Sequence, residues 1–155
     1  MNSPSGSWST AVSATLHCLT GCAVGEVLGM ILSTWWGWGN VGSIVLSVVL
    51  AFFFGYLLTF SSVRRHGASP RESVRLALAS DTVSIATMEV VDNLFILVVP
   101  GAMAAGLDTT LFWWSLAVSL AVAFVAAVPV NHWLILRGRG HAVVHRIHDG
   151  HAAHR

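Results

Sequence analysis

A histidine, two cysteines and a glutamate lie close together in an apolar stretch near the start of the chain. They are His17, Cys18, Cys22 and Glu26. Imidazole and thiolate groups suit Cu(I) or Zn(II), and a spacing of four residues on a helix can place two ligands near one ion. A carboxylate near the middle of a spanning helix costs roughly 2.5 to 3.5 kcal/mol, so such a residue indicates a functional site. These residues predict a transition-metal site, with copper favoured over zinc.

A second group of polar residues interrupts an apolar run in the middle of the chain. It comprises Asp81, Glu89, Asp92 and Asn93. On a helix, Asp81 and Asp92 fall on one stripe and Glu89 flanks it. Together with Glu26, these residues predict a path for a cation or a proton through the protein interior, with Asp81 at its inner mouth.

Helical spacing also predicts which groups meet. Cys18, Cys22 and Glu26 share one stripe of the first predicted helix, and glycines run beside it at positions 21, 25 and 29. Small residues at this spacing let a neighbouring helix approach closely. We therefore expect this face to be buried against protein, with the acidic stripe of residues 81–92 as its partner.

The composition of the 155-residue chain determines what kind of elements carry these groups. Hydrophobic residues make up 55% and charged residues 10%, with a mean hydropathy of +0.72, whereas soluble proteins average roughly 25% charged residues. Apolar runs of spanning length cover residues 8–36, 41–60, 74–99 and 110–136. We predict an all-α fold, an integral membrane bundle of four antiparallel transmembrane helices over residues 1–139. The second helix, whose polar residues are few, is expected to serve as packing.

The arginines predict the orientation of this bundle. The connection between the second and third runs contains Arg64, Arg65 and Arg71, and the chain after residue 136 contains the four arginines at 137, 139, 146 and 155. Cytoplasmic loops are enriched in such residues, so both termini are predicted to be cytoplasmic in a multi-pass protein of the cell inner membrane. A net charge of +1 argues against nucleic-acid binding. Ser69, Pro70 and Glu72 predict the start of the third helix.

Two further histidine features bear on metal binding. In the predicted topology His132 returns to the depth of His17, so it is a candidate fourth ligand of the metal site or, paired with His17, an axial ligand of haem. Residues 140–155 form a predicted cytoplasmic tail with five histidines, at positions 141, 145, 148, 151 and 154. Such a tract either collects metal or is a weakly basic tail at the anionic membrane surface.

Three segments carry a resemblance to a known family. Residues 16–30, 81–93 and 129–132 resemble an uncharacterised bacterial integral-membrane family that is catalogued as a domain of unknown function. The resemblance covers about residues 13–139 and leaves out the histidine-rich tail. It implies a four-helix membrane protein and supplies no activity.

These observations favour a small membrane protein that is not an enzyme. The leading hypothesis is that it binds a transition-metal cation and, in its fuller version, moves that cation across the bilayer through a polar interior. One alternative is a proton or monovalent-cation pathway that uses the intramembrane acids. Others are a structural or assembly subunit and a haem-binding bundle. Four helices are few for an enclosed path, so we also expect a homo-oligomer.

Overall fold

Four long helices form the fold in the computed structural model, which describes residues 4–65 and 67–137. They are α1 (Pro4–Trp35), α2 (Asn40–Arg65), α3 (Pro70–Val98) and α4 (Thr110–Leu136), with a short 3₁₀ helix, η1 (Ala102–Ala104), before α4. The described residues contain no strand, so the predicted all-α class is confirmed. The predicted histidine-rich tail, residues 140–155, lies outside the described residues.

The helix boundaries follow local capping chemistry. Ser69 caps α3, Pro70 occupies its first position, and the Ser69 hydroxyl accepts a hydrogen bond from the Glu72 backbone N–H at 3.3 Å, which confirms the predicted start. Thr109 caps α4 in the same way and accepts from the Phe112 N–H at 3.3 Å. These caps pair backbone donors that have no partner within the helix.

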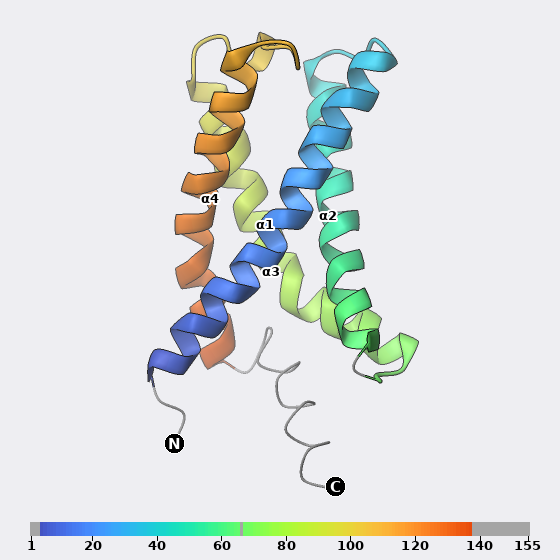
Figure 1. The fold of residues 1–155 in the computed structure, drawn as a ribbon, viewed down its shortest axis with the longest axis vertical. Coiled ribbons are helices and arrows are strands. Elements are labelled where there is room, and N and C mark those ends of the chain that lie inside the picture. Colours follow the sequence, from blue (N-terminus) through green and yellow to red (C-terminus); the bar gives the residue numbers. More distant parts are fainter. Residues whose placement is uncertain (1–3, 66, 138–155) are drawn as a thin grey trace, which may run out of the picture.

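Successive helices run up and down, as Figure 1 shows. The α1–α2 and α3–α4 connections lie at one end of the molecule. At the other end α1 begins, α2 ends, α3 begins and α4 ends. Because this second end carries every arginine in the described part of the chain, we call it the arginine end. Its arginines are Arg64, Arg65, Arg71, Arg75 and Arg137.

Three of the four helices are long and apolar enough to cross a membrane. They are α1 from Trp8 to Trp35, α2 and α4. The 29-residue α3 is not among them, and it contains four acids, Glu72, Asp81, Glu89 and Asp92. The prediction of four spanning segments is therefore borne out for three of them by length and composition.

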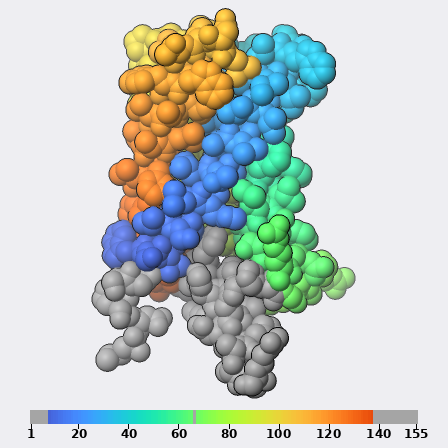
Figure 2. Space-filling view, viewed as in Figure 1, coloured from blue at the N-terminus to red at the C-terminus, as the bar shows by residue number. Residues whose placement is uncertain are grey.

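The glycines of α1 pack against α2. A Cβ atom added at Gly21 would lie 2.7 Å from the Gly55 Cα, and one added at Gly25 would collide with the Ala51 backbone. The expectation that this face is buried against protein is confirmed: the glycines face α2, and the neighbouring cysteine stripe faces α3. In Figure 2, α1 crosses the visible face diagonally and lies over the interior between α4 and α2.

Candidate functional site

A partly open cavity of about 240 Å³ lies at the end opposite the arginines. All four long helices and η1 contribute to its wall, and Trp38 and Gly106, from the two connections at this end, also line it. We call this part of the molecule the cavity end. The cavity has room for several water molecules.

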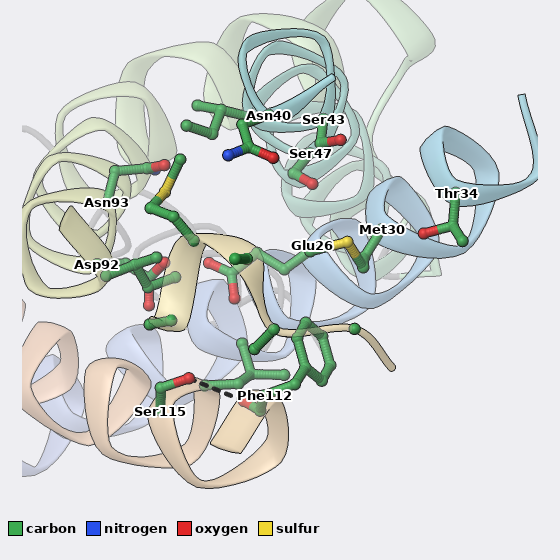
Figure 3. Close-up of a pocket in the computed structure, with 18 of the residues that line it drawn as sticks. Glu26, Met30, Thr34, Asn40, Ser43, Ser47, Asp92, Asn93, Phe112 and Ser115 are labelled. Atoms are coloured by element: carbon green, nitrogen blue, oxygen red, sulfur yellow. Dashed lines mark hydrogen bonds between the residues drawn. The ribbon is translucent and has the colours of Figure 1, made fainter. Parts of the chain in front are cut away.

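Three carboxyl groups meet at the cavity, and all three are buried. Glu26 of α1 is 8% exposed, and Glu89 and Asp92 of α3 are 4% and 2% exposed. Figure 3 shows Glu26 and Asp92 extending into the space between α1 and α3 from opposite sides. We refer to Glu26, Glu89 and Asp92 as the carboxyl triad.

The carboxyl triad has few hydrogen-bond donors. Both side-chain oxygens of Glu26, both of Glu89 and Oδ1 of Asp92 are buried with no hydrogen-bond partner in the described part of the chain. Ser119 of α4 is a polar neighbour of Asp92. Because a buried carboxylate without partners is costly, the triad needs protons, cavity water or a cation to balance it.

The polar wall of the cavity extends onto α2. Asn40, Ser43 and Ser47 of this helix line it, and Figure 3 shows their side chains across from Glu26. The second helix, which was expected to serve as packing, therefore also contributes polar side chains to the cavity wall. Asn93 of α3 also lines the cavity, and its Nδ2 donates to the Glu89 backbone oxygen at 2.8 Å.

Sulfur atoms lie directly beyond the carboxyl triad. The Cys22 Sγ of α1 is 4.0 Å from the Met88 Sδ of α3. Glu26 and Glu89 are both electrostatic neighbours of the Cys22 thiol. Cys22 and Met88 belong to the central apolar cluster of the protein, together with Cys18, Ile85 and three alanines.

A second ionisable group occupies the next level towards the arginine end. The Cys18 Sγ lies 3.9 Å from Asp81 Oδ1, which also accepts a hydrogen bond from Ser80 Oγ at 2.7 Å. His17 and Thr59 are further electrostatic neighbours of Asp81. The contacts of Cys18 with Asp81 and of Cys22 with Met88 confirm that the predicted stripes of α1 and α3 face each other.

A hydrogen-bonded junction joins α4 to α1 and α3 near the level of Asp81, and sequence reasoning did not predict it. Asn131 of α4 donates from Nδ2 to Thr15 Oγ1 of α1 at 2.7 Å and to Ser84 Oγ of α3 at 2.9 Å. All three residues are buried. The available signal was a lone asparagine in an otherwise apolar helix, but spacing alone does not identify its two partners.

His132, the predicted fourth ligand of the metal site, lies where α4 packs against the N-terminal part of α1. Its ring stacks on Trp8, with ring centroids 3.8 Å apart and an interplanar angle of 12°. The neighbouring Asn131 bonds to Thr15, two residues before His17, so this part of α4 packs against α1 close to the predicted site.

Within residues 4–65 and 67–137, no three or more histidine, cysteine, aspartate or glutamate side chains are grouped so that they could hold a metal ion. In this geometry, therefore, the three carboxyl groups of the triad do not all bind one ion directly. The triad instead suits a cation that keeps part of its water shell, because the cavity provides space for that water.

Fold and site together define an all-helical protein of membrane type with a carboxyl-lined cavity. Residues 7–140 match the family described as a domain of unknown function, DUF4396, and the chain belongs to that family. The family resemblance inferred from the sequence is confirmed. No match was found among curated proteins or among solved structures.

Proposed function

We propose that this chain is a four-helix membrane protein that takes up a small cation through the cavity and binds it at the carboxyl triad. The observation that carries the proposal is the triad itself, three buried carboxyl groups from two helices with five oxygens that have no hydrogen-bond partner in the described part of the chain. Such groups are expensive in a membrane protein and mark ion pathways.

Membrane insertion is supported by the tryptophans, which all lie near helix ends. Trp35, Trp36, Trp38, Trp113 and Trp114 lie at the cavity end, and Trp8 and Trp133 lie at the arginine end; each is about half exposed or more. Tryptophan is enriched at both membrane surfaces. The nineteen residues from Trp114 to Trp133 correspond to about 29 Å of helix, which matches the roughly 30 Å hydrocarbon thickness of a bilayer.

The proposal includes α3 as a fourth, antiparallel span despite its acids. Asp81, Glu89 and Asp92 are all buried inside the protein, so they do not meet lipid. The opposite face of α3 is apolar and exposed, with Val83, Val90, Leu94 and Leu97. A helix with this division can span when its acids face a polar interior.

The arginines favour a cytoplasmic arginine end and an opposite, non-cytoplasmic cavity end. In this orientation of the inner membrane, both termini are cytoplasmic and the cation enters from outside. Asp81, with its neighbours Cys18 and His17, is the next ionisable group along the path. The fuller version of the proposal is that the cation passes from the carboxyl triad to this level and leaves at the arginine end.

Flux measurements in liposomes test this proposal. Purified protein is reconstituted, and proton, Na⁺, K⁺ and Cu(I) uptake are measured separately for the wild type, Glu26→Gln, Glu89→Gln and Asp92→Asn. We expect each substitution to lower the uptake of the transported cation by about tenfold or more, since it removes a buried charge from the binding site. The matched control is Glu72→Gln, an exposed acid at the start of α3, which should retain wild-type uptake.

Equal uptake by the wild type and the three triad variants, or no uptake above empty liposomes for any of these cations, would contradict the proposal. A structural or assembly role would then be the better hypothesis.

A further inference from the structure

We infer that the cation is a soft monovalent one, Cu(I) in the first instance, and that it binds between the Cys22 thiolate and the Met88 thioether just beyond the carboxyl triad. This inference rests on the proposed function for the route by which the ion arrives. It names the cation and adds Met88, a ligand that the sequence reasoning did not include.

The distribution of sulfur along the molecule is the first support. Met30 and Met103 line the cavity, Cys22 and Met88 lie beyond the triad, and Cys18 lies one helical turn further on. These five residues carry all the sulfur of the described part of the chain. By contrast, α2 and α4 contain 26 and 27 mostly apolar residues and no sulfur. If methionine and cysteine served only as apolar filling, we would expect some of them in these two helices.

The spacing of the two sulfur atoms is the second support. The Cys22 Sγ and the Met88 Sδ are 4.0 Å apart. Two metal–sulfur bonds of about 2.3 Å separate their sulfur atoms by about 4.0 Å when the ion is three-coordinate, with a water from the cavity as its third ligand. The two side chains can thus hold one ion without a change in the spacing of α1 and α3.

The chemistry of the ligands selects the ion. Thiolate and thioether sulfur are soft donors that prefer Cu(I), whereas Na⁺, K⁺ and Mg²⁺ prefer oxygen. Binding replaces the proton of the Cys22 thiol, which leaves through the cavity, and the oxidation state of the ion does not change. The carboxyl triad attracts cations in general, and the sulfur pair beyond it distinguishes among them.

The competing explanation is that the Cys22 thiol donates a weak hydrogen bond to Met88 or to the neighbouring Glu89 carboxyl, and that Cys22 and Met88 only fill the core. The two explanations differ in what a metal titration shows. Core packing requires the shape of the side chains, whereas metal binding requires their sulfur.

The test is a Cu(I) titration of the purified full-length protein in detergent, under a reductant and against a coloured Cu(I) chelator, with X-ray absorption at the copper edge. The wild type should bind a Cu(I) ion with two sulfur ligands. Met88→Leu, which conserves volume, should lower the affinity for this ion by about tenfold or more, and Cys22→Ala should abolish the sulfur-ligated ion. Ile85→Leu, in the same apolar cluster, is the packing control and should bind as the wild type does.

Sulfur-ligated Cu(I) that persists in a Cys22→Ala, Met88→Leu double variant would overturn the inference, and so would a wild type that binds no such ion. The liposome experiment separates the two proposals. If alkali cations or protons cross and Cu(I) does not bind, the carboxyl triad proposal stands and the copper inference fails. If Cu(I) binds to the sulfur pair and nothing crosses, the binding site stands and transport fails.

Discussion

At the level of Asn131, one amide joins three helices through hydrogen bonds of 2.7 and 2.9 Å to Thr15 and Ser84. At the cavity, five oxygens of the carboxyl triad are buried with no hydrogen-bond partner in the described residues. Both regions place polar groups inside an apolar bundle. The difference teaches which of them stabilises the fold, since a satisfied polar group adds to stability and an unsatisfied one subtracts from it.

We therefore infer that the junction at Asn131 stabilises the fold and that the carboxyl triad lowers its stability. Proteins tolerate such costs where function requires them. This contrast makes predictions of opposite sign for substitutions in the two regions.

The largest effect is expected where the backbones of α1 and α2 are in close contact. Gly25 lies in α1 between Thr15 and the α1–α2 connection, and a Cβ added there would collide with the Ala51 backbone of α2. Gly25→Ala should lower the free energy of unfolding by about 3 kcal/mol, because neither backbone can move aside cheaply. Denaturant titration in detergent micelles measures this loss.

Gly39→Ala is the matched control, because a Cβ at Gly39 has no atom within 4 Å. An equal loss of stability for both variants would mean that α1 and α2 are not in close contact at Gly25.

A smaller loss is expected at the junction. Asn131→Leu keeps the volume of the side chain and leaves the buried Thr15 and Ser84 hydroxyls without this donor. We expect a loss of about 1 to 3 kcal/mol, measured by the same titration. Ser33→Ala is the control, since the Ser33 hydroxyl donates to the Met30 carbonyl of its own helix and to no other helix in the described residues. A loss at Ser33 as large as that at Asn131 would remove the distinction between the junction and an ordinary buried hydroxyl.

The smallest effect, and one of opposite sign, is expected at the triad. Glu26→Gln replaces a buried acid that must carry a proton to donate to Asp92, its neighbour across the cavity, with an amide that always carries donors. The free energy of unfolding should stay the same or rise by up to about 1 kcal/mol. A clear loss of stability in the same titration would show that the carboxyl triad stabilises the fold, and the contrast between the two regions would fail.

Much of the fold was predictable because hydrophobic runs and helix caps are local signals. The bounds of α4 and the capped start of α3 agree with the sequence predictions. The facing stripes of α1 and α3 were also predictable, since residues four apart on a helix share a face. The contact of Cys18 with Asp81 follows from that periodicity.

The spacing of residues along α1 could not predict which neighbouring helix packs on each side of its cysteine stripe. The glycines of α1 face α2, and the neighbouring stripe faces α3, because α1 packs against both at once. Nor could spacing alone identify Trp8 as the ring that stacks on His132. The place of Asn40, Ser43 and Ser47 in the cavity wall was not predicted, because the cavity forms only when all four helices are assembled.

The spacing of Asp92 and Asp81 along α3 has an electrical consequence. They are eleven residues apart, or about 16 Å of helix, roughly half of the hydrocarbon thickness. Transfer of one elementary charge across a full potential of 100 mV amounts to about 2.3 kcal/mol, so half of that distance amounts to about 1.2 kcal/mol. In the proposed orientation, an inside-negative potential would draw a cation from the triad towards Asp81. The membrane potential would therefore contribute to the occupancy of the Asp81 level.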